Sequence, residues 1–454
     1  METIKARHAL TPEGWQENVE IDVGDDGRIV SIRDGCALPA GIVAVALPAP
    51  GNLHSHTFQR AMAGLTERRG PAASDSFWTW RELMYRFLER LTPDDIEAIA
   101  AQTFVEMLEA GYAAVAEFHY LHHAPGGAAY DRLSETGARI FAAADATGIG
   151  LTHLPVLYTH GGLDRRPLQG GQQRFGCDID RFARLVEETA ALLKAAPEDA
   201  RLGIAPHSLR AVSPDDLTEA ARMRPGFPIH MHIAEQTAEI EEVETVRGTR
   251  PVRWLFDSAD VDVRWCLIHA THMEPDETLA LARSGAVAGL CPITESNLGD
   301  GIFDGRRFVE AGGTFGIGSD SNVQIALSGE LRTLEYAQRL KERLRVVLAT
   351  PQRSAGRFLF EGAAAGSARA LGRESGVLEA GRLADIVLLD GESLPLAGLS
   401  GDTLLDAFIF AGDDRVVTDV WSAGRHVVSG GRHHAREAVE ARYRAVLARL
   451  RAEL

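Results

Sequence analysis

Two histidines separated by one residue, His54 and His56, follow an apolar segment that prolines interrupt. Side chains on a strand face the same side every second residue, so both imidazoles would point one way. Such a pair can hold a metal ion. A chance His-x-His pair is common in a chain with 16 histidines, so the pair alone is weak evidence. Other residues of the same chemistry must support it.

Residues that bind metals or move protons also stand at the ends of other short apolar segments. His232 and Glu235 end one segment, His269 ends another, and Asp320 follows a Gly-Ser pair at the end of a further one. Neutral imidazoles and a carboxylate can hold a Lewis-acidic divalent ion and leave a position open for water. A single histidine at a strand end is more often a structural residue, and an acid after Gly-Ser often caps a helix. Agreement at four separate segment ends favours a metal site.

The segments that carry these residues alternate with helical patterns, which is typical of parallel strands joined by helical crossovers. Thr92 and Ser213, each followed by proline and two acids, predict helix N-termini, and Gly111 ends the first of these helices. Eight strand–helix units predict an α/β fold, the (β/α)8 TIM barrel, whose chemistry lies at the C-terminal ends of its strands. The predicted strands are Val45–His56, Tyr112–Tyr120, Gly150–Tyr158, Arg201–His207, Pro228–Glu235, Arg264–Thr271, Gly285–Pro292 and Thr314–Ser321.

The two ends of the chain differ from this pattern. Residues 1–47 and 375–431 contain alternating, glycine-punctuated strands, and neither part has enough apolar surface to fold alone. We therefore expect both to form one small flanking β-sandwich domain beside a barrel of residues 48–374. Residues 432–454 predict a charged amphipathic helix packed on the outside.

Composition excludes several classes of function. The chain has 454 residues, a formal charge of -17 and a hydrophobic fraction of 45%, which is typical of a globular enzyme and argues against a nucleic-acid partner. The four cysteines are scattered and form no Cys-x-x-Cys pair, so neither a disulfide framework nor a thiolate zinc site is expected. No segment resembles a signal peptide or a membrane span, and we expect a cytoplasmic protein that binds no membrane.

On these motifs the chain resembles the amidohydrolase superfamily, in particular its single-metal deaminase branch. The resemblance covers essentially the whole length, and Gly381–Val387 looks like the strand with which that superfamily re-enters its flanking sheet. It implies that Glu235 shuttles protons and that His269 orients or polarises the attacked centre. Of the neighbouring histidines, His230 would support the site or the core, and His272 is a weaker candidate than His269. The resemblance assigns the metal to His54, His56, His232 and Asp320.

The lysines bear on the number of metal ions. Two-metal relatives use a carboxylated lysine on a central strand, whereas Lys194 and Lys341 lie in helical patterns here and Lys5 lies near the N-terminus. We therefore expect one divalent ion. Zinc is the expected metal, although imidazoles and a carboxylate would also accept iron or another divalent ion.

Five stretches narrow the substrate: Phe58–Arg60, Phe77–Arg81, Glu117–His123, Ala205–Arg210 and Ser319–Asn322. Together they resemble members of this branch that hydrolyse an amidine C–N bond of a linear dicarboxylate. Arg81 and Arg210 would bind carboxylates with their planar guanidinium groups. For each arginine alone a surface salt bridge is the competing interpretation, and Trp78 and Trp80, in the loop that carries Arg81, are expected to pack in the core. The other predicted substrate-binding residues are Gln59, Tyr120, His207 and Ser321.

Two alternatives stay open. A deaminase of a ring substrate, such as guanine or an adenosine derivative, would use the same metal ligands but aromatic stacking in place of two arginines. A metal-free barrel that only binds a partner would lack at least one ligand, and all four are present. Asp320 is also expected to act in catalysis by taking a proton from water. A homodimer is the expected assembly.

Overall fold

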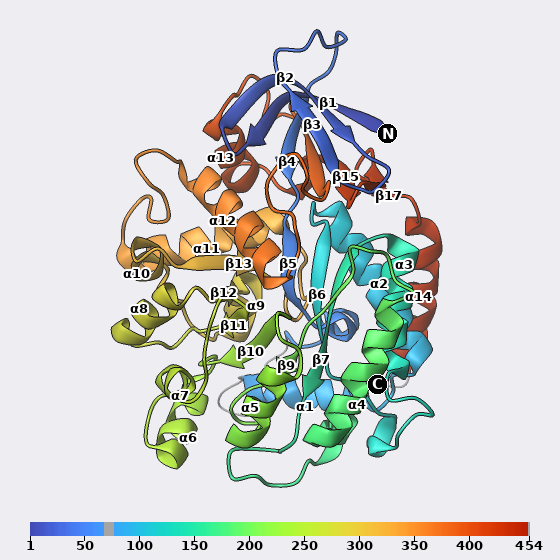
Figure 1. Ribbon diagram of the computed structural model, residues 1–454, viewed down its shortest axis with the longest axis vertical. Coiled ribbons are helices and arrows are strands. Elements are labelled where there is room, and N and C mark those ends of the chain that lie inside the picture. The colour runs from blue at the N-terminus through green and yellow to red at the C-terminus, as the bar shows by residue number, and fades with distance from the viewer. Residues whose placement is uncertain (68–76, 453–454) are drawn as a thin grey trace.

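The computed structural model describes residues 1–67 and 77–452, and Figure 1 shows a barrel with a sheet at one end. Short parallel strands form the barrel wall, and β8 and β9 together occupy its fourth position. These strands are β5 (Gly51–Ser55), β6 (Ala114–His119), β7 (Gly150–Leu157), β8 (Arg201–Leu202), β9 (Ala205–Pro206), β10 (Ile229–Ile233), β11 (Trp265–His269), β12 (Val287–Leu290) and β13 (Thr314–Ile317).

Two single bridges join the two parallel sheets. Ile204 pairs with Ile229, and Ser55 pairs with Asp320, so β9 meets β10 and β13 meets β5. The wall therefore closes, and the predicted (β/α)8 barrel is confirmed. Near the second bridge a Cβ on Gly318 would lie 2.7 Å from the backbone nitrogen of His54, so only glycine permits β13 to approach β5 this closely.

Helices surround the barrel, and their caps follow the sequence signals. Thr92 caps α2, its side chain accepts from the backbone N–H of Asp95, and Ser213 caps α5 in the same way through Asp216. The helices are α1 (Phe77–Leu88), α2 (Pro93–Glu109), α3 (Glu135–Thr147), α4 (Ile179–Leu193), α5 (Pro214–Met223), α6 (Thr237–Arg247), α7 (Pro251–Ser258), α8 (Pro275–Ser284), α9 (Pro292–Leu298), α10 (Gly305–Glu310), α11 (Leu327–Glu342) and α12 (Ala355–Ala370), with 3-10 turns η1 (Thr57–Met62), η2 (Pro125–Gly127) and η3 (Gly170–Arg174).

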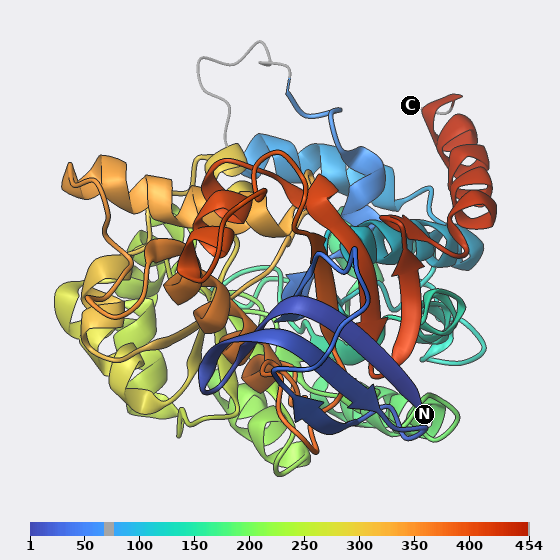
Figure 2. The same cartoon turned by 90° about the horizontal axis from the view of Figure 1, so that it is seen from above.

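Both ends of the chain contribute to one eight-stranded sheet, which Figure 2 shows from above. Its order is β17-β16-β15-β14-β4-β1-β2-β3, and a second, smaller apolar core lies against it. These elements are β1 (Glu2–Thr11), β2 (Gly14–Val23), β3 (Ile29–Arg33), β4 (Ala44–Pro48), β14 (Ile386–Asp390), β15 (Val417–Ser422), β16 (Arg425–Ser429) and β17 (Arg432–His433), together with α13 (Asp402–Phe410) and η4 (Asp414–Val416).

A buried ion network fastens this sheet to the barrel. Arg373, which follows α12, binds Asp385 through two hydrogen bonds of 2.6 and 2.8 Å, and its Nη1 reaches Asp199 at 2.8 Å. Arg425 of β16 binds the same Asp199. Two parallel N–H···O bonds fix the relative orientation of both groups, so the network sets how the sheet meets the barrel.

Three boundaries differ from the sequence prediction. The expected first strand, Val45–His56, is two strands of different sheets, because Pro50 has no N–H for a ladder and separates β4 from β5. The stretch from Phe77 to Arg81, expected in a loop, begins helix α1, whose sequence contains neither glycine nor proline. The C-terminal helix α14 (Arg436–Ala452) packs on α2, after β17 has already extended the sheet into residues 432–433.

Within the described ranges, 1–67 and 77–452, no helix combines the length and apolarity needed to cross a membrane.

Candidate metal centre

Backbone pairing between β5 and the segment after β13 brings three of the predicted ligands together. The backbone N–H of Asp320 donates to the carbonyl of His54, and the N–H of His56 donates to the carbonyl of Asp320, each at 2.9 Å. His232 arrives on β10, where its backbone N–H donates to the carbonyl of His207 at 3.0 Å. Closure of the barrel thus gathers side chains as far apart in the sequence as His54 and Asp320, which are separated by 320 − 54 = 266 positions.

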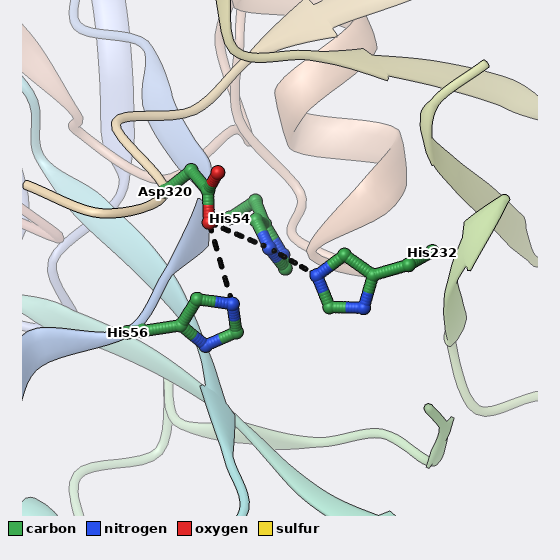
Figure 3. Close-up of side chains that lie close together, drawn as sticks. All are labelled: His54, His56, His232 and Asp320. Atoms are coloured by element: carbon green, nitrogen blue, oxygen red, sulfur yellow. Dashed lines mark hydrogen bonds and ion pairs between the residues drawn. The ribbon is translucent and has the colours of Figure 1, made fainter. Parts of the chain in front are cut away.

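The four side chains converge on one point, as Figure 3 shows. The Nε2 atoms of His54 and His232 lie 3.0 Å apart. The Asp320 Oδ1 atom lies 3.4 Å from Nε2 of His54 and 3.3 Å from Nε2 of His56. One donor atom from each of the four buried residues falls within 4.8 Å of the others, so a single ion could contact all of them.

Hydrogen bonds on the far side of the rings prepare two of the histidines for a metal. Nδ1 of His56 lies 3.0 Å from the carbonyl of Phe118, and Nδ1 of His232 lies 3.2 Å from the carbonyl of His207. Because a carbonyl only accepts, each Nδ1 must donate its proton, which leaves the Nε2 lone pair directed at the centre. These donors fit a divalent ion.

Charge at the centre matches this interpretation. Burial lowers the pKa of His54 to about 3 and lowers the pKa of His56 and His232 as well, so all three imidazoles are neutral at neutral pH. Burial acts to raise the pKa of Asp320, but the hydrogen bond from His54 and the neighbouring histidines outweigh it and hold that pKa well below its usual range. Neutral imidazoles and an ionised carboxylate are the forms that coordinate metals.

An acid and an imidazole lie beside these ligands. Nε2 of His269 is 3.8 Å from Oε1 of Glu235 and 3.8 Å from Oδ2 of Asp320. Burial raises the pKa of Glu235, so this carboxyl group retains a proton at higher pH than an exposed glutamate. Burial opposes a charge on His269, but Glu235, Glu295 and Asp320 together raise its pKa to about 10. The site therefore combines a proton donor with a cationic ring.

The ends of the strands that carry these groups have unusual backbone conformations. Ala234, His269 and Asp320 have φ values of 53°, 68° and 45°, in the left-handed region that costs a residue with a side chain about 1–3 kcal/mol. Buried Glu239 stabilises one of these turns, since its two oxygens accept the backbone N–H groups of Ala234 and Glu235 at 3.3 and 3.1 Å. Nothing in the sequence pattern singled out Glu239.

A side-chain amide network supports the junction between β5 and β13. The Nδ2 atom of Asn322 donates to the hydroxyl of Ser55 and to the carbonyls of His56 and Asp320, each at 3.1 Å. Asn52 and Ser319 complete the network, with Asn52 Nδ2 2.6 Å from the Ser319 hydroxyl. Sequence analysis did not predict a role for these residues, and their positions around the His54 and Asp320 segments were the available signal.

A cavity opens from the metal centre at the C-terminal ends of the barrel strands, and every predicted substrate-binding residue lines it. Gln59 donates to the hydroxyl of Tyr120 at 2.9 Å, and His207 lies 3.0 Å from the hydroxyl of Ser208. The predicted residues on this wall are Gln59, Arg81, Tyr120, His207, Arg210 and Ser321, beside His56, His232, Glu235, His269 and Asp320.

Two cations therefore face the cavity. Nε of Arg81 donates to the hydroxyl of Tyr85, and the guanidinium carbon lies 5.1 Å from the centre of the Tyr85 ring. Burial acts to lower the pKa of Arg210, but Glu239 and Tyr158 raise it above its ordinary value, so this guanidinium stays charged. An acidic chain thus provides local positive charge where an anionic substrate would bind.

Apolar and aromatic side chains that sequence analysis did not assign complete the wall: Met84, Tyr85, Tyr158, Phe175 and Leu298. Trp80, expected in the core, packs against the core and also lines the cavity. The side chain of Trp78 lies outside the described part of the structure. Of these residues, Tyr158 could most easily have been found from the sequence, because it ends a predicted strand.

The two weaker histidine candidates have structural partners. His230 lies 2.8 Å from the carbonyl of Ala370, and His272 lies 2.7 Å from the carbonyl of Asp300. Neither belongs to the group of four converging donors.

Comparison with known proteins identifies the family of this chain. Residues 37–427 match the family model described as "Amidohydrolase family", and residues 1–41 match "Formimidoylglutamate deiminase HutF, N-terminal domain". A "Formimidoylglutamate deiminase" of Pseudomonas aeruginosa is 50% identical over 444 residues, which cover 96% of this chain and 97% of that protein.

Solved structures show the same fold. The crystal structure of an amidohydrolase from Brucella melitensis is 50% identical, with a TM-score of 0.94, and the match covers 99% of this chain and 100% of that one. An adenosine deaminase from Xanthomonas campestris, solved with bound zinc, is 21% identical with a TM-score of 0.82, covering 99% and 98% of the two chains.

Proposed function

This chain belongs to the amidohydrolase family, and we propose that it hydrolyses N-formimidoyl-L-glutamate to N-formyl-L-glutamate and ammonia, a step of histidine degradation. It is a hydrolase of an amidine C–N bond. The observation that carries the proposal is one cavity whose wall includes three of the four candidate metal ligands, an acid and two guanidinium groups. The 50% identity with a formimidoylglutamate deiminase supports the same substrate.

The positions of the side chains suggest a role for each. When bound, the metal supplies a Lewis acid that activates a water molecule for attack on the formimidoyl carbon. Asp320 accepts a proton from the attacking water as the C–O bond forms. Glu235, whose raised pKa keeps a proton available, protonates the imino nitrogen. His269 stabilises the developing charge. Asp320 then relays its proton to the leaving nitrogen, the hydroxyl proton of the tetrahedral centre passes to Glu235 as the C=O bond forms, and the C–N bond breaks to release ammonia.

The cavity wall would bind the rest of the substrate. Arg81 and Arg210 would each bind a carboxylate, because a guanidinium forms strong charge-assisted hydrogen bonds with that group. Gln59, Tyr120, His207 and Ser321 would supply neutral hydrogen bonds to the carboxylates and to the formimidoyl group. We assign this chemistry to residues 48–374, with residues 1–47 and 375–431 forming the flanking domain and 432–454 an outer helix.

We propose one zinc ion held by His54, His56, His232 and Asp320. Three imidazoles and one carboxylate suit zinc. The lysines support a single ion, since Lys5 lies on β1, Lys194 ends α4 and Lys341 lies on α11, all remote from the ligands. We further propose a homodimer in the cytoplasm, where the four free cysteines would stay reduced.

An ammonia-release assay tests the substrate assignment. Purified chain loaded with zinc is incubated with N-formimidoyl-L-glutamate, with guanine and with adenosine, and N-formyl-L-glutamate is measured beside ammonia. We expect equal amounts of both products from the first substrate and none from the rings. Ammonia from a ring alone would establish the alternative deaminase, whereas no ammonia from a zinc-loaded chain with any substrate would contradict deamination.

A further inference from the structure

We propose that Glu295 is a positioning residue that acts through His269, holding the proton on Nδ1 and keeping Nε2 directed at the reacting atoms. This inference rests on the proposed function and deepens it. Glu295 lies on α9, directly after β12, and does not line the cavity. Any effect of Glu295 on catalysis must therefore pass through the imidazole that does.

The hydrogen bonds around one oxygen fix the direction of the contact. Oε1 of Glu295 accepts the backbone N–H of Cys291 at 3.0 Å and lies 3.3 Å from Nδ1 of His269. A carboxylate oxygen has two lone pairs, so Oε1 can accept the N–H of Cys291 and an N–H of the imidazole at once, and we assign Nδ1 as the donor. All three residues are buried, so water cannot take over either bond.

The same contact decides which ring atom faces the substrate. With Nδ1 bound to Glu295, Nε2 lies 3.8 Å from both Glu235 and Asp320, between the two proposed proton-transfer groups. A half-turn of the ring would replace Nε2 by Cε1 at this position. A carboxylate behind a histidine holds the ring in the orientation that catalysis needs.

Helix α9 holds Glu295 rigidly relative to the metal ligands. The N–H of Glu295 donates to the carbonyl of Cys291 at 2.9 Å. The hydroxyl of Thr294 donates to the carbonyl of Ser319 at 3.2 Å and accepts the N–H of Ser321 at 3.3 Å, on both sides of Asp320. The oxygen that orients His269 is therefore tied to the segment that carries the catalytic carboxylate.

His269, Cys291 and Glu295 also have donor atoms within 4.8 Å of one another, so a second metal ion is the competing interpretation. A ring nitrogen that donates a proton has no lone pair for a metal, and the oxygen concerned already accepts two N–H groups. The geometry thus favours a hydrogen-bonded relay. Metal analysis distinguishes the two, because a relay predicts one ion per chain in the wild type and in Glu295 variants alike.

The test compares Glu295→Ala and Glu295→Gln with the wild type on whichever substrate the wild type converts. We expect Glu295→Ala to lower kcat about 100-fold with KM within about threefold, and Glu295→Gln, which keeps an acceptor oxygen, to recover about tenfold of that loss. If Glu295→Ala does not fold, Glu295→Leu removes the acceptor and fills the space, and the same 100-fold loss is expected.

Glu335→Gln is the matched control, since Glu335 is a buried carboxylate that accepts the backbone N–H groups of Val347 and Leu348 away from the cavity. Its kcat should stay within twofold of the wild type. A kcat within twofold for folded, metal-loaded Glu295→Ala or Glu295→Leu would overturn the inference, as would a second ion lost with Glu295. Conversion of a ring substrate alone would retire the proposed function and leave this inference standing, whereas a wild type inactive on every substrate would overturn both.

Discussion

The two arginines of the cavity provide the sharpest test of substrate choice. Replacing Arg81 by Met keeps much of the side-chain volume and removes the guanidinium. A hydrogen bond to a charged group contributes about 1.5–3 kcal/mol, and each 1.4 kcal/mol corresponds to a factor of ten in binding. Because Arg81 is partly exposed, we expect the lower value, which is about a tenfold loss in kcat/KM expressed mainly in KM.

Arg210 should matter more. It lies within electrostatic reach of Glu235 and Glu239, close to the proposed reacting groups. We expect Arg210→Met to lose about 100-fold in kcat/KM, near the upper end of the same range. Arg86→Met is the control, because Arg86 lies exposed on the same helix as Arg81 and does not line the cavity.

A substrate with only one carboxylate tests whether the arginines bind the carboxylates of the substrate. N-formimidoylglycine has the same reacting group and only one carboxylate. One of the two arginines would bind the carboxylate that this compound lacks. Replacing that arginine by Met should cause no further loss of activity on the compound, because the interaction is already absent. Ammonia release is measured for every pair of enzyme and substrate. If both arginine variants stay within twofold of the wild type on N-formimidoyl-L-glutamate, the carboxylate assignment is wrong and the ring-substrate alternative gains support.

Three further predictions concern the acid, the metal and a buried carboxyl group. Glu235→Gln should lower kcat about 10²–10⁴-fold while retaining the metal, measured by ammonia release and metal analysis, and wild-type activity would exclude Glu235 as the proton donor. Removing the metal with a chelator should abolish ammonia release and lower the Tm, and added zinc should restore both; full activity in metal-free protein would contradict a hydrolytic metal. Burial raises the pKa of Glu117 from 4.5 to about 7, so its folded state binds a proton more tightly than the unfolded chain. The stability that this proton contributes is complete below about pH 4.5 and is lost as the pH rises through 7, a change of about 3 kcal/mol in the free energy of unfolding. Denaturant unfolding across this pH range should show the change in the wild type and not in Glu117→Gln. An unchanged pH dependence in Glu117→Gln would contradict the assignment.

Strained backbone turns and the buried carboxylates that stabilise them occur together at the ends of the barrel strands. The left-handed turns lie at or beside Asp320, Glu235 and His269, the residues proposed to move or stabilise charge. Glu239 binds the backbone of one turn, and Glu295 binds the ring carried by another. A strained conformation persists only where its surroundings fix it, and buried carboxylates that accept N–H groups provide that here.

The barrel and the converging ligands could be predicted from the sequence because both depend on local pattern. Apolar segments alternating with capped helices specify strand–helix units, and polar residues such as His232 and Asp320 interrupt the pattern at the strand ends. The Arg81 segment was wrongly expected in a loop, because aromatic residues have only a modest helix propensity and gave no strong helix signal, although the sequence of α1 contains neither glycine nor proline. The arginines still reached the cavity, since parallel strands and their following segments share one rim.

The sequence by itself thus determined the fold class and the residue types of the candidate metal centre, because periodicity and strand-end chemistry are properties of neighbouring residues. Only the tertiary structure decided which polar side chains hydrogen-bond the histidine ring and the backbone turns of the site. Glu239, Glu295 and Asn322 gain their roles from contacts between segments far apart in the chain or from backbone turns without a sequence signature. Hydrogen bonds depend on distances of a few tenths of an ångström, and those distances exist only once the barrel has closed.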